Sequence, residues 1–222
     1  MDQVILCPLE IELKYLLEGF KKLNLEIKPA QIGKLNAYEI PQINALVCRG
    51  GHGKVQFGVQ TQYVISQFPN LNSIFCVGAA GALSEELNVG DLVIAEKTIE
   101  HDYTEKFNTK AQLPEFLGNA DLLGKAKSVK GANFKIHFGC IASGDEDIIS
   151  HERAVELQKK TGALAVAWEG AGGARACSFN KMPFLELRGI TDNARHDVAN
   201  SFEKNLPVVM NNLSYFLESV LK

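Results

Sequence analysis

Three acidic residues, far apart in the chain, each lie just after a short apolar run that predicts a strand. Glu12 follows the run 4–7, Glu169 follows the run 164–167, and Asp192 follows the run 184–190. Open α/β sheets bind ligands in a crevice at the carboxyl ends of their strands, where all three acids are expected to lie. A carboxyl group in such a crevice can exchange protons with a ligand. The three acids are therefore candidate functional residues.

Each acid also has a purely structural explanation. Glu169 could cap the helix that follows it, and Glu12, together with Glu10, could occupy a first helical turn, because acids stabilise the positive end of the helix dipole. Asp192 could be an ordinary turn residue after a strand. The residues alone leave both explanations open, and the same is true of the acids in the segment 145–147, which could form a solvated turn or bind a ligand.

The pattern along the chain predicts strands that alternate with helices. We expect strands at 4–7, 73–77, within 88–97, at 134–142 and at 184–190, helices at 55–68, 117–129, 151–160 and 198–221, and a meander of short antiparallel strands within 25–47. Glycine-rich turns are expected at 49–54 and 78–83, and the helix after Glu169 carries three glycines, which favours close packing against a neighbouring backbone or a ligand. The fold class is therefore α/β: one domain over residues 1–222, with three αβα layers and a central mixed sheet.

Composition excludes several classes of protein. The chain has 222 residues, 46% of them hydrophobic, and a net charge of −3, and no basic stripe indicates nucleic acid as a partner. No apolar run approaches the ~18 residues of a membrane span, and the first residues lack the basic region of a signal peptide. The five cysteines are widely spaced, as in a reduced cytoplasmic protein, and the histidines lack metal-ligand spacing, so we expect neither a metal nor a cofactor.

Five short motifs occur between residues 77 and 192. They are Val-Gly-Ala-Ala-Gly-Ala-Leu at 77–83, Asn-Val-Gly-Asp-Leu-Val at 88–93, Ala-Ser-Gly-Asp at 142–145, Trp-Glu-Gly-Ala at 168–171 and Arg-Gly-Ile-Thr-Asp at 188–192. In order and approximate spacing they resemble the nucleoside phosphorylase/hydrolase superfamily, and most of all its 5′-methylthioadenosine/S-adenosylhomocysteine nucleosidases. The 23 positions from Glu169 to Asp192 (192 minus 169) and an acid at position 12 agree with that resemblance.

The resemblance implies hydrolysis of the N-glycosidic bond of 5′-methylthioadenosine and S-adenosylhomocysteine, which releases adenine and the 5′-thioribose for methionine salvage. Glu12 would activate the water nucleophile, Asp192 would donate a proton to purine N7, and Glu169 would hold the ribose hydroxyls. The further substrate-binding positions that it implies are His52, Ala79, Ala80, Gly81, Asp147, Ile148, Trp168 and Thr191, the last as a support for Asp192. A homodimer is also implied, in which Phe107 would reach the partner subunit's 5′ pocket.

Phosphate-using members of the superfamily differ from this chain at two places. They carry an arginine two residues before the glycine segment and a Gly-Asp-Pro turn after the first strand. Here Cys76 occupies the first place, and the second reads Pro-Leu-Glu-Ile-Glu. A phosphate dianion without an arginine fork would be poorly held, so we expect water as the nucleophile, with a phosphorylase as an alternative.

Three residues depart from the nucleosidase pattern around the substrate. Asp147 stands where an aromatic residue stacks on adenine, Trp168 stands where a methionine precedes the glutamate, and His52 stands where an aliphatic residue lies near the 5′ substituent. Trp168 could replace the lost stacking surface or could belong to the core. Two further alternatives are a hydrolase of another 5′-modified purine nucleoside, such as a futalosine-like one, and a nucleoside-binding protein without activity.

Overall fold

The fold is a mixed sheet with helices on both faces. The structure, a computed structural model, describes residues 2–107, 112–129, 133–194 and 198–222. The strands in this part of the chain are β1 (Gln3–Cys7), β2 (Lys28–Ile32), β3 (Leu35–Ile40), β4 (Ala45–Arg49), β5 (Ser73–Ala82), β6 (Leu92–Glu100), β7 (Glu115–Leu117), β8 (Ile136–Ser143), β9 (Ala165–Ala167) and β10 (Phe184–Asp192). The helices are α1 (Glu10–Lys22), α2 (Lys54–Gln67), α3 (Ala120–Lys127), α4 (His151–Thr161), α5 (Gly170–Phe179) and α6 (Val198–Leu221), with a short 3-10 turn η1 (Pro41–Ile43).

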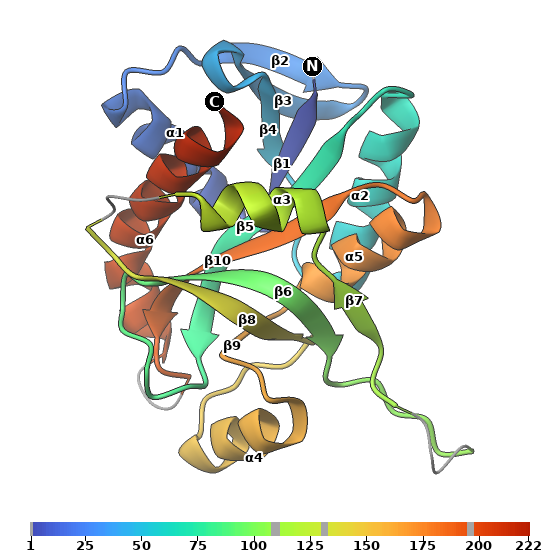
Figure 1. Ribbon diagram of the computed structural model, residues 1–222, viewed down its shortest axis with the longest axis vertical. Helices are drawn as coiled ribbons and strands as arrows, with labels where there is room; N and C mark the ends of the chain where they lie inside the picture. The colour runs from blue at the N-terminus through green and yellow to red at the C-terminus, as the bar shows by residue number, and fades with distance from the viewer. Residues whose placement is uncertain (1, 108–111, 130–132, 195–197) are drawn as a thin grey trace.

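Alternate side chains of the first strand enter two different cores. Ile5 and Cys7 pack in the core beneath α1 and α6, whereas Val4 and Leu6 pack in the core beneath α2 and α5. Figure 1 shows these two helix pairs on opposite sides of the sheet, with α4 below it. The predicted three-layer αβα arrangement around a mixed sheet is thus confirmed, because strands that alternate in this way need a helical cover on each face.

The sheet also curls into a closed circuit, which the sequence did not predict. β5 pairs with β10, β10 with β6, β6 with β8, β8 with β9, and β9 returns to β5. Small and branched residues fill the inside of this circuit, among them Ala80, Val93, Ala165 and Ile190. Closure brings the end of β9, and the acid that follows it, back to the ends of β5 and β10.

Two predicted boundaries, the end of β5 and the start of α3, are wrong. The glycine-rich segment 78–83 was expected to be a turn, but β5 continues through it to Ala82, because β10 and β9 both pair with this stretch. Leu117 was expected to begin a helix, but it belongs to β7, and α3 begins at Ala120 after a side-chain cap from Asn119. The antiparallel meander within 25–47 and the final helix at 198–221 agree with the prediction.

Parallel strands place the candidate residues at one edge. β1 runs parallel to both β4 and β5, and β5 runs parallel to β10. The carboxyl ends of these four strands therefore lie together, and the segments that carry Glu12, His52, Ala79 and Asp192 follow or form those ends.

Candidate active site

One cavity of about 380 Å³ opens at this edge of the sheet. It is lined by every residue that the sequence analysis named as catalytic or substrate-binding: Glu12, His52, Ala79, Ala80, Gly81, Asp147, Ile148, Trp168, Glu169, Thr191 and Asp192. Its volume lies in the range of small-molecule sites. The structure thus brings together side chains that are separated by up to 180 positions (192 minus 12) in the chain.

Glu12 is a buried carboxylate at the start of α1, and only 2% of it is exposed. Its Oε1 accepts a hydrogen bond from the N–H of Ala79 at 2.8 Å, and its Oε2 accepts one from the N–H of Leu9 at 2.8 Å. Burial, and then the neighbouring carboxylate of Glu169, raise the pKa of Glu12 to about 7, although the guanidinium of Arg188 and the two N–H groups oppose this rise. A carboxyl group with a pKa near neutrality can accept a proton from water.

Gly78 allows the carboxylate of Glu12 to lie against β5. A Cβ atom at Gly78 would lie 2.6 Å from Oε1 of Glu12 and 2.9 Å from Nη1 of Arg188. No side chain fits at these distances, so the glycine segment of β5 is needed for the approach of two charged groups to the backbone.

Glu169 occupies the N-cap position of α5, yet its side chain makes no capping hydrogen bond. Instead its Oε1 accepts from the N–H of Gly53 at 3.2 Å and lies 3.2 Å from Nδ1 of His52. Its Oε2 accepts from Nη2 of Arg188 at 3.2 Å. The helix-cap explanation for Glu169 is therefore wrong: the carboxylate lines the cavity and contacts groups from two other segments, the one before α2 and β10.

Asp192 ends β10 and lies mostly buried in the same cavity. Its Oδ2 accepts from the hydroxyl of Thr191, and its Oδ1 accepts from the N–H of Ala194, both at 2.8 Å. Burial raises the pKa of Asp192, against the opposing effect of these two hydrogen bonds. The group is therefore easier to protonate than an exposed aspartate, as a general acid requires.

His52 and Trp168 form an aromatic shelf on the cavity wall. Their rings stack with centroids 4.4 Å apart and planes inclined by 22°. Trp168 is only partly buried and lines the cavity. It is therefore available to a ligand and does not belong to the core. Asp147 is exposed at the cavity, and the buried Ile148 beside it gives an apolar surface.

Arg188 is a cavity residue that the sequence analysis missed. It is 1% exposed and comes from the middle of β10, where its guanidinium contacts Glu169, Glu186, the carbonyl of Ala79 and the sulfur of Cys76. The expectation that the site lacks an arginine is therefore wrong. A signal was present in the sequence, because Glu186 and Arg188 alternate with leucines in an otherwise apolar strand, and buried charges in such a place are usually paired.

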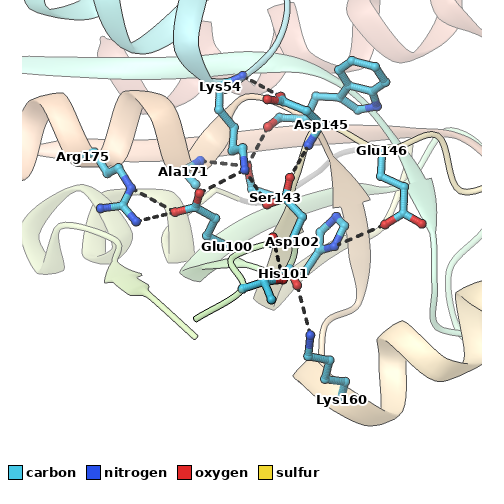
Figure 2. A network of polar contacts seen from close by, with 12 residues as sticks. Lys54, Glu100, His101, Asp102, Ser143, Asp145, Glu146, Lys160, Ala171 and Arg175 are labelled. Atoms are coloured by element: carbon cyan, nitrogen blue, oxygen red, sulfur yellow. Dashed lines mark hydrogen bonds and ion pairs between the residues drawn. The ribbon is translucent and has the colours of Figure 1, made fainter. Parts of the chain in front are cut away.

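A network of ion pairs and hydrogen bonds holds the loop 144–148 beside the cavity (Figure 2). The ammonium group of Lys54 pairs with Glu100 at 3.0 Å and also with Asp102. The backbone N–H of Lys54 donates to Asp145 at 2.8 Å, and the N–H of Asp145 donates to Asp102 at 2.9 Å. Arg175 donates to Glu100 at 2.9 Å through its Nε. Lys54 in α2 and Asp102, just after β6, thus hold the loop at Asp145, and Arg175 in α5 supports this anchor through Glu100.

Ser143 extends this network to the aromatic shelf. Its hydroxyl donates to the carbonyl of Trp168 at 2.8 Å and accepts from the N–H of Ala171 at 2.9 Å. The hydroxyl therefore fixes the backbone on both sides of Glu169, at the junction between β9 and α5. A residue in such a place controls where the carboxylate and the indole point.

Within the described ranges, no group of three or more His, Cys, Asp or Glu side chains is arranged to hold a metal ion. The cysteines are free thiols, and burial raises the pKa of Cys48 to about 12 and that of Cys140 to about 11. Thiols of this kind are inert packing groups rather than nucleophiles. Among the described residues that line the cavity, the ionisable side chains are thus carboxylates, the guanidinium of Arg188 and the imidazole of His52.

Comparisons with known proteins agree over nearly the whole chain. The family model of the phosphorylase superfamily matches residues 2–222. The chain is 33% identical to the 5′-methylthioadenosine/S-adenosylhomocysteine nucleosidase of Thermotoga maritima over 160 residues, which is 72% of this chain and 71% of that relative. It is 30% identical to the nucleosidase of the same name from Staphylococcus haemolyticus over 230 residues, covering 98% of each.

Solved structures give the same assignment. The nucleosidase of Neisseria meningitidis, in complex with methylthio-immucillin-A, superposes with a TM-score of 0.87 at 28% identity and covers 100% of this chain and 98% of that one. The futalosine hydrolase of Helicobacter pylori superposes with a TM-score of 0.84 at 27% identity, covering 99% and 97%. The chain therefore belongs to the phosphorylase superfamily, in the family of the 5′-methylthioadenosine/S-adenosylhomocysteine nucleosidases.

Proposed function

We propose that residues 1–222 form one catalytic domain that hydrolyses the N-glycosidic bond of 5′-methylthioadenosine and S-adenosylhomocysteine. The products are adenine and the 5′-thioribose, which would feed methionine salvage. The observation that carries the proposal is that Glu12, Glu169 and Asp192 all line one cavity, from three different parts of the chain. The curated relatives named above are nucleosidases for these two substrates, which supports the same reaction here.

Asp192 is the proposed general acid. Breaking an N-ribosyl bond leaves negative charge on the departing purine, and a proton at N7 makes that base a neutral leaving group. A carboxyl group can supply the proton if its environment favours the protonated form, which burial does for Asp192. Thr191 and Ala194 fix the two oxygens of this carboxyl and so its orientation.

Glu12 is the proposed base, and Glu169 the proposed ribose-binding group. With a pKa of about 7, Glu12 can take a proton from a water molecule that attacks the opposite face of the sugar. Glu169 is held by Arg188 and by the N–H of Gly53, so its carboxylate is oriented before a ribose arrives. A fixed negative group beside the ring also stabilises the positive charge that develops on the sugar in the transition state.

Water is favoured over phosphate as the nucleophile because Arg188, the one arginine among the described residues that line the cavity, is already engaged. Arg188 bonds to Glu186 at 2.8 Å and to Glu169 at 3.2 Å, and Glu12 adds a third carboxylate nearby. A phosphate dianion would meet a region of net negative charge there.

Release of adenine tests the proposal. The purified chain is incubated with 5′-methylthioadenosine in phosphate-free buffer, and adenine is measured by chromatography, with Asp192→Asn as the inactive control. Adenine release without phosphate is the expected result. A rate that depends on added phosphate would instead identify a phosphorylase, and no release with any purine nucleoside would refute an enzymatic role.

A second candidate function is hydrolysis of another 5′-modified purine nucleoside, of the futalosine type. The observation that favours it is the stacked pair of His52 and Trp168, with the exposed carboxylate of Asp147 at the same cavity. The similarity to a futalosine hydrolase structure is nearly as high as that to the nucleosidase structure. A panel of 5′-methylthioadenosine, S-adenosylhomocysteine, adenosine and futalosine, compared by kcat/KM, separates the two functions.

We further propose that the chain acts as a homodimer in the cytoplasm. Large apolar side chains are exposed along α2, α5 and β7 and in the segment before β7: Val55, Val59, Tyr103, Phe107, Leu117 and Phe179. Figure 1 shows α2, α5 and β7 on the same side of the molecule. Exposed apolar residues of this kind indicate a covered surface, and a second copy of the chain is the proposed cover, with Phe107 reaching across it.

The state of the cysteines supports the proposed location. All five cysteines are free, as expected in a reducing compartment. No helix within the described residues has both the length and the apolar composition that a bilayer span requires.

A further inference from the structure

Glu186 is a buried carboxylate to which the proposed reaction gives no role. It lies on β10 two residues before Arg188, so the two side chains share one face of the strand, and it is 0% exposed. Its Oε1 accepts from Nε of Arg188 at 2.8 Å, and its Oε2 accepts from the hydroxyl of Thr98 at 2.6 Å. Both oxygens are thus bonded, and the carboxylate is held between β10 and β6.

The other donors of Arg188 point toward the cavity. Nη1 donates to the carbonyl of Ala79 at 3.2 Å, while Nη2 donates to Glu169 at 3.2 Å and lies 3.4 Å from the sulfur of Cys76. Arg188 therefore contacts Cys76. Cys76 occupies the position at which the phosphate-using members of the superfamily carry an arginine. A cation in this place could bind an anion from solvent, because guanidinium groups pair well with phosphate oxygens.

Charge balance decides what Arg188 can bind. Glu186, Glu169 and Glu12 are three buried carboxylates that all lie around one guanidinium. Glu186 occupies Nε and is farther from the cavity than the other two, since the cavity is lined by Glu12, Glu169 and Arg188 but not by Glu186. Glu186 therefore neutralises the guanidinium of Arg188 from the side that faces away from the cavity, and it does not block the cavity.

We propose that Glu186 is a positioning residue that fixes Arg188 through Nε and cancels its charge, so that this arginine orients Glu169 and does not capture inorganic phosphate. The proposal deepens the proposed function, because it names the residue that keeps the site selective for water. It is not a catalytic residue, since it touches neither the cavity nor the groups assigned to proton transfer.

Gly170 shows that the chain makes room for this carboxylate. A Cβ atom at Gly170, in the first turn of α5, would lie 2.0 Å from Oε2 and 2.3 Å from Oε1 of Glu186. Even alanine does not fit beside the glutamate. Glycine is less favourable than alanine at a helical position, and the space that it leaves is filled by the carboxylate.

Binding of inorganic phosphate tests the proposal directly. Isothermal titration calorimetry at constant ionic strength compares the unchanged chain with Glu186→Gln, which keeps the shape of the side chain and removes its charge. The expected result is at least a tenfold gain in phosphate affinity for Glu186→Gln. Thr98→Val removes the other hydrogen bond of Glu186 but leaves its charge, and Glu186→Asp keeps the charge on a shorter stem, so both should bind phosphate as weakly as the unchanged chain.

A paired variant covers the case in which Glu186→Gln does not fold. In Glu186→Val with Gly170→Ala, the added methyl group occupies the space that the carboxylate leaves, and this variant should show the same gain in affinity. The proposal is wrong if folded Glu186→Gln or the paired variant binds phosphate no more tightly than the unchanged chain, or if Thr98→Val gains as much.

A kinetic measurement links this result to the reaction. Phosphate should inhibit adenine release by Glu186→Gln in competition with substrate, and it should leave the unchanged chain unaffected at the same concentration. If the unchanged chain releases no adenine, the proposed function fails, whereas the calorimetric comparison still decides the role of Glu186.

Discussion

The hydroxyl of Thr191 donates a hydrogen bond of 2.8 Å to Oδ2 of its neighbour Asp192. The two residues end β10, and the same hydroxyl also reaches the carbonyl of Ala80 at 3.4 Å on the adjacent strand. The carboxyl group of Asp192 is thereby tied to β5, which forms the wall of the cavity. A proton donor must hold one direction toward its acceptor, and this pair of contacts provides it.

Replacement of Asp192 by asparagine should lower kcat by about 10²–10⁴-fold, because the amide cannot donate the proton that a departing purine needs. Binding of 5′-methylthioadenosine should persist, since the side chain keeps its size. Steady-state adenine release and calorimetry measure the two effects. Asn193→Ala changes the next, exposed residue and should leave kcat within a factor of two. Activity of Asp192→Asn within tenfold of the unchanged chain would contradict the assignment.

Glu12 should make the protein less stable as pH rises. Its pKa is about 7 in the folded chain and 4.5 in an unfolded one, so between these values the folded state binds more protons. Its contribution is therefore favourable at pH 4.5 and is lost progressively up to about pH 7, a change of about 3 kcal/mol. Urea unfolding at pH 5 and pH 7 should show a smaller fall for Glu12→Gln than for the unchanged chain. Equal falls in the two proteins would mean that the raised pKa is wrong.

Trp168 provides a direct signal of binding, because it is the one tryptophan in the chain and lines the cavity. Adenine that reaches the shelf of His52 and Trp168 should change the fluorescence in a saturable way. Trp168→Phe should abolish the signal while calorimetry still detects adenine. Saturable binding of adenine by calorimetry with no change in the fluorescence of the unchanged chain would place the ligand elsewhere.

Asp102 should affect binding more than turnover. It accepts from the N–H of Asp145 and pairs with Lys54, and it does not line the cavity. Asp102→Asn weakens the anchor of the loop 144–148, so KM should rise roughly tenfold with kcat changed much less, since positioning of the substrate suffers first. The matched control is Glu105→Gln, an exposed acid three residues away. A loss confined to kcat would show that the loop is not what Asp102 holds.

The proposed dimer can be tested with a pair of valines. Val59 on α2 is 65% exposed and Val208 on α6 is 58% exposed, but they lie on opposite faces of the sheet. Val59→Glu should convert the dimer to a monomer, because it places a charge in the proposed interface, whereas Val208→Glu should not. Sedimentation equilibrium measures the mass of each protein. A monomeric unchanged chain, or equal behaviour of the two variants, would refute this interface.

The strand ends and the acids could be predicted because they are local signals. Glu12, Glu169 and Asp192 each follow an apolar run, and parallel strands bring such positions to one edge. The extent of β5 could not be predicted, because Gly78 and its neighbours have low strand propensity, and only pairing with β10 and β9 makes them extended.

The contacts that hold the loop 144–148 could not be predicted from local sequence patterns. Lys54 and Asp102 are 48 positions apart, and Asp102 and Asp145 are 43 apart, so no periodicity within one element links them. The choice between the two explanations for Glu169 needed the structure for the same reason, since its carboxylate has partners from β10 and from the segment before α2 and makes no capping hydrogen bond. Closure of the sheet, which joins all these segments, is a tertiary property.

The clash between a Cβ atom at position 170 and the carboxylate at position 186 restricts the order in which this pair of residues can have arisen. An ancestor with alanine at 170 could not accept glutamate at 186 without a steric conflict at about 2 Å, whereas glycine at 170 would be tolerated beside either a small apolar residue or glutamate. Glycine should therefore have come first, and Glu186, once acquired, makes reversion at 170 unfavourable. The two sites are epistatic, and a library that varies both at once should recover glutamate only in clones that encode glycine.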